Sequence, residues 1–490
     1  MTLRDCESWV YSTGATDYVS AGRLVSESSA TIGSGGPNGD PYLALDPYNG
    51  GNAARRVISG GPFTTLIHGC RFYLTAGATG EIWFDDRVNG VQQVTLVLNP
   101  GAGQVSAYRG TDSGTLLGSS ATGVFAASAW TFLEASVTVG SGTSGSMVVK
   151  INGTVVLTLA SINTQNSARA AIDSTTWKAS GSNTTHFNIA HCYWVDTAGS
   201  ANNSFLGDVR VAGLVATADG DQTDFINQWP IGYANANGTP FAASANFVYA
   251  LPAIAALVSG TIPYVSVFVA TGFTGNIKAA LYSAAGALIA STNALSNPGS
   301  GENDLSFSSP PSVTAATSYI LAVISDTAFS LDQDSGSVTC QALARSYGSG
   351  FPSSLSGSSG FSGEIDLWAP IQQSTTLNYQ AVSEPSAFGD AAYITASVVN
   401  NFELYKVTGS FGVSAVLGVQ ASIVTRKTSA GPRSLAPIIK SGGTIGVGTS
   451  TAASISWSTI SGIFETDPST SNPFSAAALS NIQVGPKITA

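Results

Sequence analysis

Short runs of alternating apolar and polar residues, separated by turn residues, follow one another over residues 1 to about 218. The clearest example is Asn152-Gly153, which lies between two alternating runs within residues 145–159. Both central residues of a type I′ turn need positive φ, so this pair is the strongest short signal of a β-hairpin. Roughly a dozen such strands are enough for two packed sheets. The pattern therefore predicts an all-β sandwich.

Residues 191–211 show the same alternation of apolar and polar residues on both sides of a turn. In this stretch Tyr193 and Val195 are expected on one face of a strand and Trp194 on the other. A turn rich in Gly, Asn and Ser follows, and Phe205 to Val211 alternates again. The stretch thus predicts strand, turn and strand, with the second strand half-buried.

This hairpin resembles the last hairpin of the concanavalin-A-like (laminin-G-like) sandwich of many tailed-phage structural proteins. The matching pieces are the aromatic pair Tyr193-Trp194, then Asp196, the turn Gly199–Asn203, and Phe205–Val211. The phrase VKINGTVV, residues 149–156, resembles a hairpin in the back sheet of such sandwiches.

Two pieces near the end of the chain resemble phage tail-type C-terminal sandwiches, namely Phe464–Pro468 and Ile482–Lys487. A looser resemblance, through KAALYS (278–283) and TSYILAVISD (317–326), links the middle of the chain to jelly-roll modules of phage and bacterial surface proteins. A short helix is expected at 475–481, with Ser475 as its N-cap.

The fold class predicted from these patterns is all-β, with three β-sandwich or jelly-roll modules, the first concanavalin-A/laminin-G-like. The expected boundaries are 1–218 for this first sandwich, 219–232 for a linker, 233–371 for an inserted jelly-roll module and 372–490 for a C-terminal β-sandwich.

Charge limits the partners of the protein. Only 10% of residues are charged, against about 25% in an average globular protein, which favours a large assembly that covers much of the surface. The net charge is −10 without a basic stripe, so no nucleic-acid partner is expected.

The uncharged run 225–277 is interrupted by Pro252 and Pro263 and alternates at Val265 to Val269, which favours a buried strand over membrane insertion. No secretory signal is recognised at the start of the chain, so synthesis in a cytoplasm is expected.

The cysteines Cys6, Cys70, Cys192 and Cys340 lie far apart and form no CxxC pair. Reduced, packed thiols are therefore expected, with a disulfide such as Cys6–Cys192 as the alternative.

No enzyme activity is expected. The phrase Gly363–Pro370 begins like a glucanase signature with Glu364 and Asp366, but Trp368 and Ala369 stand where a second glutamate would fall. It is interpreted as a strand with two outward acids. Serine catalysis lacks a Gly-x-Ser-x-Gly elbow. The three histidines His68, His186 and His191 are expected to be structural, and no cofactor is expected.

Metal binding is weighed and not predicted. Asp85-Asp86 and Asp332-Gln333-Asp334 lack the remaining ligands of a calcium loop. A calcium ion on the rim of the sandwich stays open as an alternative, because concanavalin-A-like folds sometimes carry one. The acids and amides that could line this rim, and are preferably interpreted as fixing the turn, are Asp196, Asn202, Asn203 and Asp208.

Glycan binding is the hardest alternative to dismiss, because lectin sites stack a sugar on an aromatic ring and bind its hydroxyls with Asp and Asn. Trp177 and Trp229 stand in polar, loop-like surroundings, and the tentative glycan-binding residues are therefore Trp177, Trp229, Asp196 and Asn203. The other tryptophans considered are expected in the core: Trp83, Trp130, Trp194, Trp368 and Trp457.

The function implied by the resemblance is that of a virion structural protein of a tailed bacteriophage, a fibre, spike or decoration component that is assembled in the host cytoplasm. Its expected partners are other virion proteins and further copies of itself, through weakly charged β surfaces such as residues 441–464. The alternative is a carbohydrate-binding adhesin that recognises a glycan on the host surface.

Overall fold

The computed structural model describes residues 3–9, 24, 30–45, 53–180, 186–199, 201–233, 239–372, 378–382, 393–407, 415–427 and 432–490. These residues form strands almost throughout, so the predicted all-β class is confirmed. The chain divides into two compact units: residues 1–220, 403–426 and 433–490 form the first, and residues 221–402 and 427–432 form the second.

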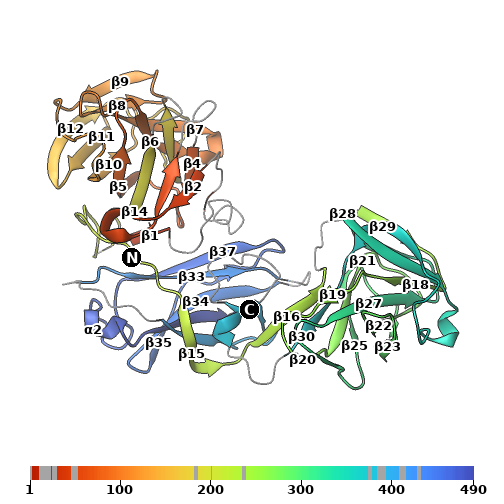
Figure 1. The fold of residues 1–490 in the computed structure, drawn as a ribbon. Helices are drawn as coiled ribbons and strands as arrows, with labels where there is room; N and C mark the ends of the chain where they lie inside the picture. Colours follow the sequence, from red (N-terminus) through yellow and green to blue (C-terminus); the bar gives the residue numbers. More distant parts are fainter. Residues whose placement is uncertain are drawn as a thin grey trace. The chain divides into compact units, whose positions relative to one another are not determined.

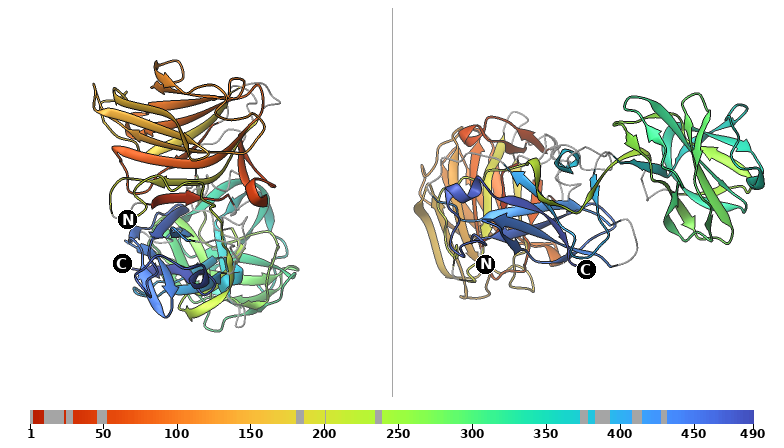
Figure 2. Two further views of the ribbon diagram at one scale, coloured as in Figure 1. Left: turned by 90° about the vertical axis from the view of Figure 1, so that its left-hand side faces the viewer. Right: turned by 90° about the horizontal axis from the view of Figure 1, so that it is seen from below.

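The first sandwich consists of two antiparallel sheets (Figures 1 and 2). One sheet has the order β12-β11-β10-β5-β14-β3-β2, with β1 also paired to β14, and the other has the order β4-β13-β6-β7-β8-β9. The strands of the first sheet are β1 (Leu3–Glu7), β2 (Ala30–Gly33), β3 (Tyr42–Leu45), β5 (Thr65–Leu74), β10 (Thr131–Thr138), β11 (Gly145–Ile151), β12 (Thr154–Ile162) and β14 (Phe187–Val195). Those of the second are β4 (Ala53–Val57), β6 (Thr79–Asp86), β7 (Val91–Asn99), β8 (Gln104–Arg109), β9 (Thr115–Ser119) and β13 (Ser174–Ser180).

The inner faces of the two sheets meet in one hydrophobic core. Phe72 and Trp194 enter this core from the first sheet, and Ile82, Phe84 and Trp177 enter it from the second. The predicted two-sheet arrangement is therefore confirmed, and its physical cause is the alternation of apolar and polar residues along each strand.

The hairpin predicted at Asn152-Gly153 is confirmed. These two residues connect β11 to β12, and their φ angles are 48° and 80°. The positive φ at both positions is what a type I′ turn requires.

The prediction for residues 191–211 is half right. Tyr193 and Val195 pack in a small cluster on the outer face of β14, whereas Trp194 enters the main core, as expected. Phe205 to Val211, however, is not a strand. Two of its backbone N–H groups donate to side chains rather than to a neighbouring strand: that of Gly207 donates to Glu134 (2.9 Å) and that of Val211 to His191 Nδ1 (3.3 Å).

The middle of the chain forms a 14-stranded sheet system, with the main order β23-β22-β27-β18-β28-β21-β30-β16-β31 (Figure 1). The stretch 219–232, expected as a linker, contributes to two strands, β15 and β16. This region also contains a short two-stranded sheet, β20-β26, and two 3₁₀ turns, η3 and η4. Its elements in chain order are β16 (Ile226–Gly232), β17 (Thr239–Ala243), β18 (Phe247–Ala250), β19 (Ile254–Ala255), β20 (Gly260–Thr261), β21 (Tyr264–Thr271), β22 (Asn276–Ser283), β23 (Leu288–Ser291), β24 (Leu295–Ser296), β25 (Gly301–Ser306), β26 (Ser312–Val313), β27 (Ser318–Ser325), β28 (Phe329–Ala344), η3 (Tyr347–Ser349), β29 (Ser359–Ile365), β30 (Leu367–Ile371), η4 (Asn378–Ala381) and β31 (Tyr393–Thr395).

The C-terminal region contributes a six-stranded sheet of order β15-β32-β38-β34-β35, with β36 paired to β34, and a two-stranded sheet β33-β37. The predicted helix is present as α2 (Ala476–Leu479), and the Ser475 side chain accepts the N–H of Ala478 at 3.0 Å, as expected of an N-cap. The strands are β15 (Ala216–Thr223), β32 (Glu403–Val407), β33 (Val419–Thr425), β34 (Ser434–Ser441), β35 (Thr444–Val447), β36 (Thr451–Ala452), β37 (Ser458–Phe464) and β38 (Gln483–Ile488).

The uncharged run 225–277 contains the buried strand that its alternating pattern predicts. In β21 the side chains of Val265, Val267 and Val269 are fully buried. Across the described part of the chain no helix combines the length and apolarity needed to span a membrane. Cys6, Cys70, Cys192 and Cys340 all lie in the described residues and form no disulfide, so the alternative of a Cys6–Cys192 bridge is not realised.

Candidate functional site

In the first sandwich, the outer face of the six-stranded sheet β4-β13-β6-β7-β8-β9 carries a stripe of polar and aromatic side chains. Ile82 and Phe84 of β6 point into the core, so the alternating residues Glu81, Trp83 and Asp85 lie on the opposite face. Glu81 and Asp85 are nevertheless almost completely buried, because neighbouring side chains on this face cover them.

Strand register aligns these residues with partners from distant parts of the chain. Arg55 of β4 lies opposite Thr176 of β13, Thr176 opposite Trp83, Trp83 opposite Thr95 of β7, and Thr95 opposite Tyr108 of β8. Neighbouring strands are about 4.8 Å apart, so this row of five residues extends over roughly 19 Å.

A pocket of about 240 Å³ opens at one end of this row. Three of its lining residues have a buried side-chain atom without a hydrogen-bond partner among the described residues: Arg55 Nε, Asp85 Oδ1 and Gln92 Oε1. A buried polar atom without a partner costs about 1–3 kcal/mol, so a hydrogen bond from a ligand to any of these atoms would be favourable. Its lining consists of Ala53, Arg55, Trp83, Asp85, Arg87, Gly90, Val91, Gln92 and Thr176.

Asp85 is the most perturbed group of the pocket. Burial raises the pKa of its carboxyl group to about 7, against the opposing effects of the Thr176 hydroxyl and the positive charge of Arg55. The Thr176 hydroxyl donates to Asp85 Oδ2 at 2.6 Å. The other oxygen, Oδ1, has no hydrogen-bond partner among the described residues. Near neutral pH the Asp85 carboxyl group is protonated about half of the time.

The indole of Trp83 is held in place from one side. Its Nε1 donates to Glu81 Oε2 at 2.7 Å, and the Lys178 ammonium lies 5.4 Å from the centre of the ring. Lys178 in turn donates to Glu81 Oε1 at 3.0 Å. These contacts fix a half-buried aromatic ring beside the pocket, which reduces the entropy lost when a ligand packs on it.

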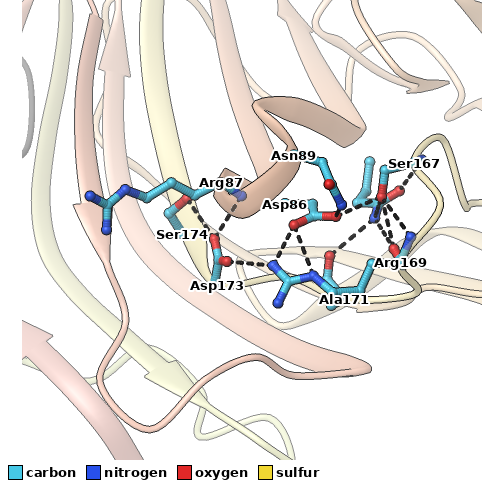
Figure 3. Close-up of polar contacts among 9 residues, drawn as sticks. Asp86, Arg87, Asn89, Ser167, Arg169, Ala171, Asp173 and Ser174 are labelled. Carbon is cyan, nitrogen blue, oxygen red and sulfur yellow. Dashed lines mark hydrogen bonds and ion pairs between the residues drawn. The ribbon is translucent and has the colours of Figure 1, made fainter.

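The turn between β6 and β7 is fixed by a separate network centred on Asp86 (Figure 3). Asp86 accepts hydrogen bonds from Arg169 Nε (3.0 Å), Ser167 Oγ (2.6 Å) and Asn89 Nδ2 (2.7 Å). Burial raises the pKa of the Asp86 carboxyl group, but these hydrogen bonds and the charge of Arg169 outweigh burial and bring it to about 2.

Asp173 connects this network to the pocket. It accepts a hydrogen bond from Arg169 at 2.7 Å and another from the backbone N–H of Arg87 at 2.9 Å. Figure 3 shows that the Arg87 guanidinium points away from the network. The network thus positions the turn that carries Arg87 and Gly90 into the pocket lining.

We expect Asp86→Asn to lower the free energy of unfolding by about 2 kcal/mol at pH 7, because the folded-state pKa lies about two units below the usual value. A depressed carboxyl pKa stabilises the fold above pH about 4, and this stabilisation is lost as the pH falls toward 2. Urea unfolding at pH 7 and pH 3 measures both effects. Equal acid sensitivity in the variant and the unchanged protein would contradict the role given to Asp86.

The sequence-based assignment of Trp177 is wrong. It lies in β13 rather than in a loop, and its side chain is 0% exposed. Its Nε1 donates to His68 Nε2 at 3.2 Å, and its ring packs edge-on against Trp9 with centroids 6.0 Å apart. A fully enclosed ring offers no face to a sugar.

The other predicted residues do not converge on a site. Asp196 is buried and accepts hydrogen bonds from Arg4 (2.8 Å to Nε) and from the N–H of Ala198, so its carboxylate is occupied by its own chain. Asn203 is exposed and donates to the carbonyl of Gly199, which fits the turn-fixing interpretation. Trp229 lies in β16 rather than in a loop, and its side chain is outside the described residues.

The other two residues considered as possible ligands of a calcium ion on the rim have protein partners as well. Asn202 donates to Glu465 at 2.8 Å, and Asp208 accepts from Arg71 Nε at 2.9 Å. Within the described ranges, no group of three or more His, Cys, Asp or Glu residues is arranged to hold a metal ion.

Asp366 also differs from its prediction as an outward acid. It is only 2% exposed. Burial raises the pKa of its carboxyl group to about 8, with further contributions from nearby Asp334, Asp332 and Glu364. Asp366 is therefore mostly protonated at neutral pH, and Glu364 is half-buried beside it.

Sequence reasoning missed the residues that line the pocket. The alternation in residues 80–86 was a usable signal, because it puts Trp83 between two acids on one face of a strand. Arg55, Thr176 and Gln92 gave no such signal, because only the register of the folded sheet brings them to Asp85.

Comparison with known proteins gives one family match. A family described as "Domain of unknown function (DUF4082)" matches residues 253–361, which lie in the middle region of the chain. No curated protein matches the chain.

Several solved structures match about two fifths of the chain. They include the carbohydrate-binding module CBM66 from Bacillus subtilis (7% identity, TM-score 0.25, 35% of this chain and 94% of that one) and the alginate lyase Aly36B (16% identity, TM-score 0.27, 39% and 96%). A third is the potassium-bound carbohydrate recognition domain of Emp46p (10% identity, TM-score 0.26, 38% and 95%). A sialidase matches with 12% identity and a TM-score of 0.29 over 40% of this chain, which spans only 18% of the sialidase. Because these TM-scores are all below 0.5, we take no function from these structures.

Proposed function

We propose that the first sandwich binds a glycan at the pocket beside Trp83. The observation that carries this proposal is that one pocket is lined by a half-buried indole and by three residues with an unpartnered polar atom, Arg55, Asp85 and Gln92. Small-ligand sites combine an apolar or aromatic surface with a few fixed polar groups, and this pocket has both parts.

The chemistry of a sugar ring fits this arrangement. Its C–H face packs on an aromatic ring, and its hydroxyl groups each donate one hydrogen bond and accept others. Gln92 Oε1 can accept from a hydroxyl group, Arg55 Nε can donate to one, and Asp85 Oδ1 can do either according to its protonation. The volume of about 240 Å³ suits one ring.

We propose binding without cleavage of the glycan. The two carboxyl groups on the outer face of β6, Glu81 and Asp85, are four residues apart, a Cα separation of about 13 Å in a strand. Glycosidases place their carboxyl pair about 5–9.5 Å apart. Both oxygens of Glu81 are already bonded, to Trp83 and Lys178, so Glu81 is not available as a second catalytic acid.

A glycan array probed with the full chain tests this function. We expect binding to a subset of polysaccharides, with no release of reducing ends from those that bind. No binding on the array, together with no binding of soluble sugars at millimolar concentration, would contradict glycan binding. Release of reducing ends would contradict binding without cleavage.

A structural role is the second candidate, and one observation favours it. Strand β35 is the last strand in the order of the C-terminal six-stranded sheet, and it exposes Ile445 (37%) and Val447 (51%) within the uncharged run 441–464. Edge strands with exposed apolar side chains pair readily with another chain. The resemblance to tailed-phage proteins supports a virion as the setting, with other copies of this chain and other virion proteins as partners.

Sedimentation velocity at micromolar concentration tests the structural role. A concentration-dependent oligomer is expected if β35 is a contact between copies. A monomer at all concentrations would remove self-association from the account and leave glycan binding unaffected.

A further inference from the structure

The balance of charges in the pocket suggests which class of glycan it selects. Two arginines, Arg55 and Arg87, line it, and Asp85 is the one acid in its lining. The nearby cation Lys178 is already paired with Glu81 at 3.0 Å. Whenever Asp85 is protonated, the lining carries two positive charges and no negative one.

Arg55 is the residue best placed to use this charge. Its Nε atom is buried and has no hydrogen-bond partner among the described residues. A guanidinium binds a carboxylate through two parallel N–H···O bonds, and such charge-assisted bonds are about twice as strong as neutral ones. A neutral hydroxyl group would use only one donor of this fork.

Asp85 makes the site sensitive to protons. When protonated, its free Oδ1 can donate to a carboxylate oxygen, which is a short and strong hydrogen bond. When ionised, the same group repels a ligand carboxylate and attracts Arg55 toward itself. The groups that face Asp85 from the surrounding elements are Arg55 of β4, Thr176 of β13, Asp173 just before β13, Arg87 of the turn η2 (Arg87–Asn89) and Gln92 of β7.

We propose that the pocket selects a carboxylated sugar, a uronic acid unit of an acidic polysaccharide, with Arg55 binding the carboxylate and Asp85 permitting this only in its protonated form. This inference rests on the proposed glycan-binding function. It adds a substrate class and a dependence on pH that the binding of a neutral sugar would not require.

Matched pairs of ligands test the selectivity. Oligomers of galacturonate, of mannuronate and of glucuronate are titrated into the full chain at constant ionic strength, each beside its carboxyl-reduced, neutral counterpart. At pH 6 we expect at least one uronate to bind at least tenfold more tightly than its neutral counterpart. If none of the three uronates binds more tightly than its own neutral counterpart, the inference is overturned.

The pH dependence gives a second, independent readout. From pH 6 to pH 8 the affinity for the uronate is expected to fall by about tenfold, because a group that titrates near pH 7 changes from about 10% to about 90% ionised over this range. In Asp85→Asn this fall is expected to disappear. An unchanged fall in the variant would overturn the role of Asp85.

Arg55→Gln is expected to reduce the affinity for the uronate to that for its neutral counterpart. The matched control is Arg109→Gln, which removes an equal charge from the same sheet but does not line the pocket. Equal losses in both variants would point to net charge and overturn the role of Arg55. Binding of neutral oligomers that depends on Trp83 would leave the proposed function standing while this inference fails, whereas no binding of any oligomer would refute both.

Discussion

Trp83→Ala is expected to weaken glycan binding by about 10- to 100-fold. The indole forms the apolar wall of the pocket, and burying an aromatic face of this kind against a ligand contributes about 1.5–3 kcal/mol. Each 1.4 kcal/mol corresponds to a factor of ten in the dissociation constant. Isothermal titration of the full chain with a glycan identified on the array measures the change directly.

The matched control is Trp457→Ala. Trp457 is also half-buried and has a cation above its ring, since the Arg426 guanidinium lies 5.2 Å from the ring centre, close to the 5.4 Å between Lys178 and Trp83. It lies in the C-terminal region, away from the pocket lining. We expect its removal to leave the affinity within a factor of two. A loss in this control as large as that in Trp83→Ala would contradict the location of the site.

Trp177→Ala is expected to have the largest effect on stability, a loss of about 3–5 kcal/mol in the free energy of unfolding of the first sandwich. The side chain is fully enclosed, and its strand β13 pairs with β4 on one side and β6 on the other. The variant loses the packing of this side chain on Trp9 and Trp194 together with its hydrogen bond to His68. His68 is then left as a buried, neutral imidazole without this donor, because burial lowers its pKa to about 4.

Urea unfolding followed by far-ultraviolet circular dichroism measures this loss, with Trp83→Ala as the comparison, for which we expect less than half of the effect. The two variants should therefore separate stability from binding. A change below about 1 kcal/mol for Trp177→Ala would contradict its place in the core.

Features that depend on neighbouring residues were predictable from the sequence. The hairpin at Asn152-Gly153 needs only two residues that tolerate positive φ between two alternating runs. The opposite orientations of Tyr193 and Trp194 follow from the period of a strand alone. The N-cap at Ser475 is equally local, since it needs one side-chain oxygen at the start of a helical turn.

Features that depend on distant partners were not predictable. Trp177 has Thr175, Thr176 and Lys178 around it in the sequence, which resembles a loop, yet pairing with strands on both sides places it in the core. Residues 205–211 alternate like a strand but bond to Glu134 and His191, which no local pattern reveals.

The pocket illustrates the same limit. Its polar groups come from β4, β6, the turn η2, β7 and β13. Arg55, Asp85 and Thr176 become neighbours only through the register of three strands. The alternation in residues 80–86 identifies one side of the pocket, with Trp83 and Asp85 on the same face. The opposing side follows from the strand order, which the sequence does not state.

Hydrogen–deuterium exchange of the full chain, with and without a bound glycan, tests the central claim most directly. We expect slower exchange on binding in β4 (Ala53–Val57) and in residues 86–92, the segments whose side chains line the pocket, with little change in residues 239–372. Protection confined to residues 239–372 or to the C-terminal strands, with unchanged exchange around the pocket, would contradict the account.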